Sequence, residues 1–328
     1  MRQWGQMQRR KFIGLLCGAM TWPIPARSQT LRRVGVLLAS DERDPEMQSR
    51  LSAFQGAMQA LGWTVGGNVQ MDVRWFGGSS ERAEVHAREI VALGPDVMVA
   101  NATVGIQAVL KATRSVPTVF VAVGNPVGTG IVASMSRPGA NVTGFSAFEP
   151  EITGRWIQTI KEIAPGTRHI GVLSYPGYEF LWEQAEAAAA ALSVAITTTT
   201  AHNAAEIEQV IATTAGRPGG ALIVVPAPVF AANRELVARL ALSRKLPAVY
   251  PFRYYVTAGG LMSYGFDAVD LFKRASGYVD RILKGESPGD LPVQAPTKFE
   301  LVINLRTARA LGIDVPSTML AQADEVVE

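Results

Sequence analysis

Hydrophobic positions along this chain form short continuous runs that alternate with stretches of helical spacing. Residues 34–39 are a continuous apolar run, typical of a strand buried in a parallel sheet. Asp44-Pro45 then has the form of a helix N-cap followed by proline at the first helical position. Apolar residues spaced three to four apart follow from Leu51 to Leu61, and Gly62 ends the pattern. The opening of the chain therefore predicts a strand followed by an amphipathic helix.

The same alternation continues to the end of the chain. In the first half it predicts strands at 69–75, 96–100, 117–122 and 142–145, and helices at 80–93 and 104–112. In the second half it predicts strands at 169–173, 194–199, 221–225, 248–250, 261–264 and 299–303. The helices of that half are expected at 152–163, 179–192, 204–213, 231–243, 268–283 and 306–311.

Strands that alternate with helices predict an α/β fold of doubly wound parallel sheets with right-handed crossovers. Some twenty elements are too many for one small sheet, and 328 residues suggest two domains. We therefore expect two α/β lobes that pack closely and share several chain crossings.

The first 28 residues have the layout of an export signal. Arg9, Arg10 and Lys11 precede a short apolar run, and Ala26-Arg27-Ser28 puts small residues before a cleavage site at Gln29. The Arg9-Arg10 pair resembles a twin-arginine signal, although the sequence does not separate this route from the general secretory one. Met7 is a possible start, and a frayed amphipathic helix is the alternative interpretation.

Cys17, the one cysteine, suggests a lipid-attachment site, but Leu16 is bulky and the apolar run before it is short. We expect Cys17 to be removed with the signal. No later segment approaches eighteen uncharged apolar residues, so no membrane span is expected.

The charge argues against a nucleic-acid partner. The chain has 31 basic and 28 acidic residues, and the first 28 positions hold five of the basic residues and no acidic ones. The remainder therefore has 26 basic against 28 acidic residues and offers no basic stripe for phosphates.

Motifs for catalysis, metals and cofactors are missing. The chain has no G-x-G-x-x-G after a strand, no P-loop and no G-x-S-x-G elbow. His86, His169 and His202 are widely spaced, and we expect them at the surface or the edge of the core. No cofactor and no metal site are predicted.

What remains is a set of polar and aromatic residues at the carboxyl ends of predicted strands, the edge where open α/β sheets bind ligands. The candidates chosen as ligand-binding are Ser40, Asn101, Thr103, Asn125, Pro126, Phe145, Tyr175, Pro226, Phe252, Tyr264 and Asp267. Runs of aromatic residues at 250–255 and 264–267 belong to the same set.

Each candidate has a purely structural alternative. Thr103 and Asp267 stand where helix N-caps are expected, Asn125 before Pro126 suits a turn, and the aromatic residues suit a core between lobes. Thr103 could combine both roles, because free N–H groups at a helix start attract carboxylates.

In order along the chain, several motifs resemble a known family. They are Arg9-Arg10-Lys11-Phe12-Ile13-Gly14, Phe54 with Leu61-Gly62-Trp63, 124–128, 137–144, 259–265, 282–285, 291–293 and 299–304. This pattern is similar to the periplasmic substrate-binding components of ABC importers, of the type I lobe topology. The subgroup is that described as an uncharacterised ABC-type transport system, periplasmic component. Asn125 departs from it, since relatives commonly carry Asp before the proline.

The resemblance implies two lobes joined by three hinge crossings, near Phe145, Tyr264 and Pro292, with a solute enclosed between them. We expect residues 31–145 plus 265–292 in lobe I, and 146–264 plus 293–328 in lobe II. Better-characterised relatives are similar to binders of aromatic amino acids. The implied partners are a small solute and ABC permease subunits, and the protein is expected to be a periplasmic monomer.

On this basis Thr103 and the start of its helix are expected to hold a ligand carboxylate, and Asp267 to pair with an ammonium group. Tyr175, Phe252 and Tyr264 would wall an aromatic side chain, with Pro226 opposite. The alternative is a periplasmic α/β enzyme acting on a small carboxylate, with Ser174, Asp267 and Asp41 as its candidate residues.

Overall fold

The computed structural model describes residues 31–147, 151–183 and 185–328 of the chain, within a single unit from Leu31 to Glu328. The predictions for residues 1–28, among them the signal, Cys17 and the cleavage site before Gln29, lie outside the described residues.

The first half of the chain builds a five-stranded sheet in the order β2-β1-β3-β4-β5, and all four strand pairs are parallel. Its strands are β1 (Arg32–Leu38), β2 (Val69–Trp75), β3 (Val97–Asn101), β4 (Thr118–Val123) and β5 (Val142–Ser146). Three of its helices follow in sequence: α1 (Pro45–Ala60), α2 (Ser80–Ala92) and α3 (Ala102–Ala112). These elements match the predicted ones to within a few residues.

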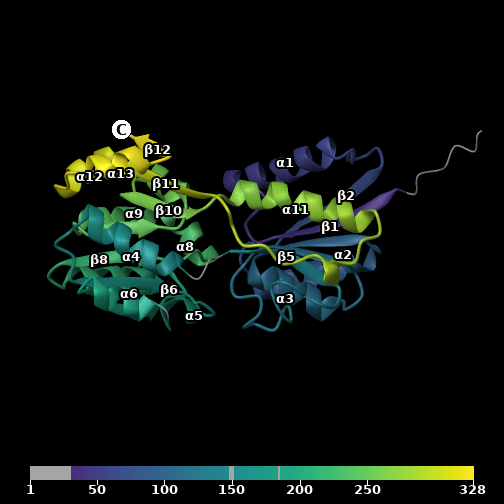
Figure 1. Cartoon of the computed structure of the whole chain (residues 1–328), viewed down its shortest axis with the longest axis horizontal. Coiled ribbons are helices and arrows are strands. Elements are labelled where there is room, and N and C mark those ends of the chain that lie inside the picture. Colours follow the sequence, from purple (N-terminus) through teal and green to yellow (C-terminus); the bar gives the residue numbers. More distant parts are fainter. Residues whose placement is uncertain (1–30, 148–150, 184) are drawn as a thin grey trace, which may run out of the picture. The chain divides into compact units, whose positions relative to one another are not determined.

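Helices cover both faces of this first sheet. On one face α1 packs beside α11 (Ala268–Leu283), a helix that comes from far along the chain (Figure 1). On the other face α2 and α3 pack together over a second cluster of buried side chains. The sheet is therefore buried on both sides, as its continuous apolar runs predict.

The second half builds a seven-stranded sheet in the order β12-β11-β10-β9-β8-β6-β7. Its strands are β6 (His169–Ser174), β7 (Ala195–Thr200), β8 (Gly220–Val224), β9 (Ala248–Tyr250), β10 (Met262–Phe266), β11 (Phe299–Asn304) and β12 (Glu325–Val327). β11 runs antiparallel to β10, which corrects the expectation of a purely parallel sheet. The reason is that β11 enters from a crossing segment, not from a helix packed on its own sheet.

The second half also contains several helices. They are α4 (Ile152–Ile163), α5 (Phe180–Glu183), α6 (Ala185–Ala191), α7 (Ala204–Ala215), α8 (Pro228–Ala232), α9 (Arg234–Ser243), α10 (Arg253–Thr257), α12 (Leu305–Leu311) and α13 (Ser317–Gln322), with a 3-10 turn at Pro288–Asp290. α8 with α9 replaces a single predicted helix, whereas α5 and α6 lie on either side of residue 184, which is outside the described residues. α10, α13 and β12 are elements that the sequence pattern did not predict.

Three crossings connect the two sheets, after β5, after β10 and after the 3-10 turn, as the sequence resemblance implied. The first and third crossings pair with each other: the Ser146 N–H donates to the Gln294 carbonyl (2.9 Å), and the Gln294 N–H donates to Gly144 (3.0 Å). The second crossing leads directly into α11.

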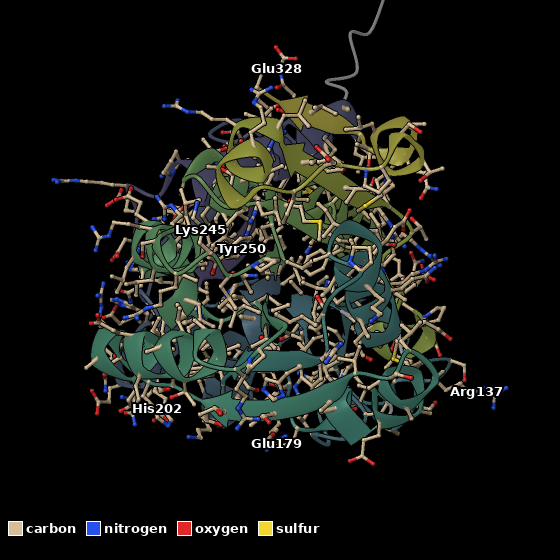
Figure 2. All side chains as sticks on the ribbon, turned by 90° about the vertical axis from the view of Figure 1, so that its left-hand side faces the viewer. Arg137, Glu179, His202, Lys245, Tyr250 and Glu328 are labelled. Atoms are coloured by element: carbon tan, nitrogen blue, oxygen red, sulfur yellow. The ribbon has the colours of Figure 1, made fainter. Side chains whose placement is uncertain are left out.

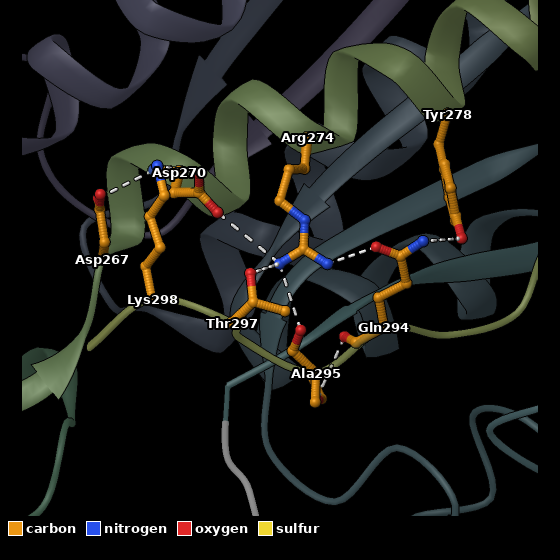
Figure 3. A network of polar contacts seen from close by, with 9 residues as sticks. Asp267, Asp270, Arg274, Tyr278, Gln294, Ala295, Thr297 and Lys298 are labelled. Carbon is orange, nitrogen blue, oxygen red and sulfur yellow. Dashed lines mark hydrogen bonds and ion pairs between the residues drawn. The ribbon is translucent and has the colours of Figure 1, made fainter.

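A polar network on α11 holds the third crossing against the first sheet (Figure 3). The Arg274 guanidinium donates to the Gln294 side chain, to the Ala295 carbonyl (3.3 Å) and to the Thr297 hydroxyl (3.2 Å). The Lys298 ammonium lies 3.0 Å from the Asp270 carboxylate on the same helix. These contacts fix the third crossing to helix α11, which packs on the first sheet.

Candidate ligand-binding site

A pocket lies between the two sheets, at the carboxyl ends of strands from both. Its empty space, which includes solvent at its open side, is about 610 Å³. We call it the inter-sheet pocket. It is lined by Ala39, Ser40, Met47, Arg50, Asn101, Ala102, Ala122, Ala147, Tyr178, Pro226, Ala227, Pro228, Ala231, Phe252, Tyr254 and Phe266.

Aromatic rings form one wall of this pocket. Phe252 meets Phe266 edge to face, with ring centres 5.1 Å apart, and lies 5.4 Å from the ring of Tyr254. The Tyr178 hydroxyl donates to the carbonyl of Pro226, another lining residue. Burial raises the pKa of Tyr254 and of Tyr178 above the usual tyrosine value, so both hydroxyls stay protonated at neutral pH.

Of the described residues that line the inter-sheet pocket, Arg50 alone carries a charge. Its guanidinium carbon lies 5.4 Å from the centre of the Phe252 ring, a cation-π arrangement. Its Nε atom is buried without a hydrogen-bond partner. Arg50 lies in the second turn of α1, one turn after Glu46. The N-terminal part of that helix therefore reaches the space between the sheets.

A second pocket adjoins the first and shares Arg50, Phe252, Tyr254 and Phe266 with it. Its empty space is about 730 Å³, and we call it the carboxylate pocket after three of its lining residues, Glu46, Asp267 and Glu300. Its other lining residues are Pro251, Arg253, Ser263, Gly265, Ala268 and Val269. Gly265 is needed here, because a Cβ atom at that position would lie 1.8 Å from the Pro251 carbonyl oxygen.

Two of these carboxylates have defined surroundings. Asp267 is the N-cap of α11, and its Oδ1 accepts a hydrogen bond from the Asp270 N–H at 2.9 Å. Glu300 is half-buried, and burial together with the nearby Asp267 carboxylate raises its pKa above the usual glutamate value. A cation placed beside Glu300 would favour the ionised form of that carboxylate.

Four predicted site residues line the inter-sheet pocket: Ser40, Asn101, Pro226 and Phe252. Asp267 lines the carboxylate pocket. The side-chain amide of Asn101, in the inter-sheet pocket, is already hydrogen-bonded. Its Oδ1 accepts from the Ala39 N–H (3.3 Å), and its Nδ2 donates to the Val121 carbonyl (3.1 Å). It therefore joins the ends of β1 and β4.

Thr103 does not occupy the position that the sequence suggested. The N-cap of α3 is Asn101, and Thr103 lies within the first turn. The inter-sheet pocket is lined by Asn101 and Ala102 but not by Thr103. The helix begins two residues earlier than its apolar spacing indicated, and Ala102 takes a left-handed φ of 63° at its start.

Other predicted residues lie in structural surroundings. Phe145 is fully buried, with its ring against Tyr278 (4.9 Å) and under the Arg274 guanidinium (5.1 Å). Tyr264 stacks on Phe299 (5.8 Å) and lines a separate pocket beside α4 and α13.

Two more predicted residues form a turn. The Asn125 Oδ1 accepts the Gly128 N–H (2.9 Å) at a left-handed φ of 40°, and the carbonyl of buried Pro126 accepts the Ile131 N–H (3.0 Å). Both therefore act in turn chemistry, the structural alternative.

Tyr175 has ring neighbours within its own half of the chain. Its ring centre lies 5.8 Å from His202 and 6.3 Å from Phe230. His202 itself is exposed at the periphery, whereas Tyr250 lies in the interior (Figure 2). His169 is buried, and burial followed by the Arg217 charge lowers its pKa, so it is neutral at pH 7.

Arg50, Met47 and Tyr178 are lining residues that sequence reasoning missed. Arg50 and Met47 belong to the first predicted helix, whose polar side looks like a solvated face. Their position in the sequence could have indicated them. They lie on the helix that follows the first strand, and that helix begins at the carboxyl edge of the sheet, where ligands bind.

The residues of the enzyme alternative are not brought together. Ser174 is buried at the end of β6, Asp41 is exposed beside Gly77, and Asp267 lines the carboxylate pocket. Among the described residues no group of three or more His, Cys, Asp or Glu side chains is placed to hold a metal ion. Within the same residues no helix has the length and apolar character needed to cross a membrane.

Comparison with known proteins places this geometry in a family. The family model described as ABC transporter substrate binding protein matches residues 36–327. A tyrosine-binding protein of Clostridioides difficile is 25% identical over 273 residues, covering 82% of this chain and 78% of that protein.

Two solved structures are similar over most of their length. A conserved domain protein from Vibrio cholerae has a TM-score of 0.84 and 31% identity, covering 90% of this chain and 99% of that one. The ABC domain in complex with L-Trp from Streptococcus pneumoniae has a TM-score of 0.82 and 26% identity over the same shares. With two α/β sheets, three crossings and a pocket between them, this chain belongs to the ABC transporter substrate-binding proteins.

Proposed function

We propose that this protein captures an aromatic amino acid between two lobes and delivers it to an ABC permease. The lobes would be residues 31–145 with 265–292 and residues 146–264 with 293–328. Ligand binding would favour a closed arrangement of the lobes through a hinge motion at the three crossings. The family supports a small solute and a permease as partners.

The observation that carries this proposal is the chemistry of the inter-sheet pocket. Apolar and aromatic side chains from both sheets enclose it, and one guanidinium faces it. Pockets of this kind suit a planar apolar group attached to a carboxylate. The relatives support the same class, since one is named for tyrosine and one was solved with L-Trp.

The ammonium group of such a ligand would reach the carboxylate pocket. Asp267 keeps one oxygen on the α11 N-terminus, and a carboxylate can accept further bonds at its other oxygen. Asp267 is therefore proposed as the partner of the α-ammonium, with Glu300 adding negative charge.

We further propose that the protein is a binding protein without turnover. Of the described residues, Ser174, Asp41 and Asp267 lie in different surroundings, which argues against the nucleophile and base of the enzyme alternative. Incubation with a bound ligand should return that ligand unchanged. Product accumulation at a steady rate would favour the enzyme alternative.

Export to the periplasm with removal of residues 1–28 is proposed from the sequence alone. Mass spectrometry of the protein recovered from the periplasm should give Gln29 as its first residue. A protein that still begins at Met1 or Met7 would contradict this.

Isothermal calorimetry tests the ligand class directly. L-Tryptophan, L-tyrosine and L-phenylalanine should bind with a 1:1 ratio, whereas L-alanine and a neutral sugar should give no heat. Binding of the sugar and of none of the aromatic amino acids would overturn the proposed function.

A further inference from the structure

Arg50 is an unusual residue for its surroundings. Half-buried arginine side chains ordinarily pair with a carboxylate or donate to carbonyl groups. Among the residues that the structure describes, the Arg50 guanidinium has no ion pair and no hydrogen bond, and its Nε atom is buried. Its contact is the face of Phe252.

The carboxylates around Arg50 do not neutralise it. Glu46 lies one turn earlier on α1 and lines the carboxylate pocket, but no ion pair joins the two side chains within the described residues. Asp44 instead caps the start of α1, where Oδ1 accepts the Met47 N–H at 3.0 Å. Within the described residues Arg50 therefore has no partner for its charge, and it lines the inter-sheet pocket as well as the carboxylate pocket.

The other candidate for a carboxylate is the start of α3. There the Asn101 side chain is used by Ala39 and Val121, and Thr103 is not among the lining residues. Arg50 is the better group, because it is charged, is open to the pocket and can form two parallel hydrogen bonds to one carboxylate.

We propose that Arg50 binds the carboxylate of the ligand, with the ligand's aromatic ring on the wall that contains Phe252. The assignment rests on the proposed function and narrows its ligand class: an aromatic carboxylate is required, whereas an aromatic amine without a carboxylate is a poor ligand. The Phe252 ring contacts the guanidinium group, and both residues line the inter-sheet pocket.

Calorimetry on Arg50→Gln, Arg50→Lys and unaltered protein tests this assignment. The probes are L-tryptophan, 3-indolepropionate, which lacks the ammonium, and tryptamine, which lacks the carboxylate. Arg50→Gln should weaken both carboxylates by about tenfold or more and leave tryptamine within about twofold. Arg50→Lys should recover part of the loss, because it restores charge without the planar donor fork.

Two matched variants complete the experiment. Arg43→Gln removes the same charge from an exposed residue just before α1 and should bind all three probes as the unaltered protein does. Thr103→Ala tests the start of α3 and should have the same small effect as Arg43→Gln. Melting temperatures of all variants establish that each is folded.

The results separate this inference from the function on which it rests. If the unaltered protein binds none of the three probes, the proposed function is overturned and the inference with it. If it binds L-tryptophan and folded Arg50→Gln binds equally well, the function stands and the assignment of Arg50 is overturned. Loss of binding in Thr103→Ala but not in Arg50→Gln would show that the start of α3, and not Arg50, binds the ligand carboxylate.

Discussion

The inter-sheet pocket and the carboxylate pocket share a wall but differ in chemistry. The first is apolar and aromatic with one cation, and the second contains three carboxylates beside Arg50 and Arg253. The shared residues Arg50, Phe252, Tyr254 and Phe266 separate the two spaces. The two charged groups of an α-amino acid are attached to one carbon atom, so at this wall the carboxylate could lie beside Arg50 and the ammonium beside the carboxylates.

This difference shows how one site can recognise both charged groups of an amino acid without an internal ion pair. Arg50 lines both pockets but forms no ion pair within the described residues, which leaves its charge available to a ligand group. The cost of desolvating such charges is offset only when the ligand supplies both partners. Specificity for zwitterions then follows from the arrangement of two pockets around one aromatic wall.

The largest effect should come from removing the wall. Phe252→Ala joins the two pockets and deletes the ring that contacts Phe266 and supports Arg50. We expect the Kd for L-tryptophan to rise about 30- to 100-fold, from the lost burial of one aromatic side chain.

Phe299→Ala is the matched control for Phe252. Phe299 is also half-buried and, like Phe252, packs against buried side chains of both halves of the chain. It lines the separate pocket that contains Tyr264. It should lower the melting temperature without a comparable loss of affinity. Equal losses of affinity in both variants would mean that Phe252 acts only through folding.

The next effect concerns the carboxylate pocket. Asp267→Asn keeps a side chain that can cap α11 but removes its charge, so L-tryptophan should bind about tenfold or more weakly while 3-indolepropionate is unaffected. Asp44→Asn, at the cap of α1, is the matched control. An equal loss for both ligands in Asp267→Asn would contradict its role as the ammonium partner.

A smaller effect is expected where the two halves of the chain approach each other. Gly78 follows β2, and a Cβ atom there would lie 3.2 Å from the Cβ of Pro228, which lines the inter-sheet pocket. Gly78→Ala should weaken L-tryptophan about three- to tenfold, because the added methyl group opposes the approach that encloses the ligand.

Gly66→Ala separates backbone strain from this contact. Gly66 has a similar left-handed φ of 81°, against 76° for Gly78, but a Cβ atom there would meet nothing within 4 Å. Both variants should lose about 1–2 kcal/mol of stability from the strained conformation. Only Gly78→Ala should lose affinity for L-tryptophan. An equal loss of affinity in both variants would show that the contact with Pro228 does not cause it.

The smallest effect is the pH dependence of stability through Glu300. The pKa of Glu300 is higher in the folded than in the unfolded protein, so its ionisation costs more free energy in the folded state. The free energy of unfolding therefore declines as pH rises from the unfolded-state pKa through the folded-state pKa of this group. Glu300→Gln should stabilise the protein at neutral pH by less than about 1 kcal/mol, because solvent screens a half-buried group. The gain should vanish at a pH below the unfolded-state pKa, as denaturant titrations at several pH values would reveal; a variant that is less stable at neutral pH would contradict it.

Much of the fold could be predicted because its signals are local. α4 and α11 match the predicted ranges, since apolar spacing and, for α11, the Asp267 cap act within a few residues. α10 was missed because its aromatic residues, Tyr254 and Tyr255, pack through tertiary contacts with Phe252 and Tyr250 and carry no helical period. The antiparallel β11 depends on a crossing that no local pattern encodes.

The site was predicted less completely than the fold. The edge of the sheets identified Ser40, Asn101, Pro226 and Phe252 as lining residues, because strand ends converge there. Thr103 lies two residues after the N-cap of α3, and Tyr264 lines the separate pocket beside α4 and α13, so neither is among the residues that line the inter-sheet pocket. Arg50 could not be singled out, because an arginine on an amphipathic helix shows its lack of partners only in three dimensions.

The central claim is that two adjoining pockets recognise the two charged groups of one aromatic amino acid. The most direct measurement is the affinity of the unaltered protein for L-tryptophan, 3-indolepropionate and tryptamine under one condition. The account predicts that L-tryptophan binds tightest, and that each analogue, lacking one charged group, binds at least about tenfold more weakly. Tryptamine or 3-indolepropionate binding as tightly as L-tryptophan would contradict it.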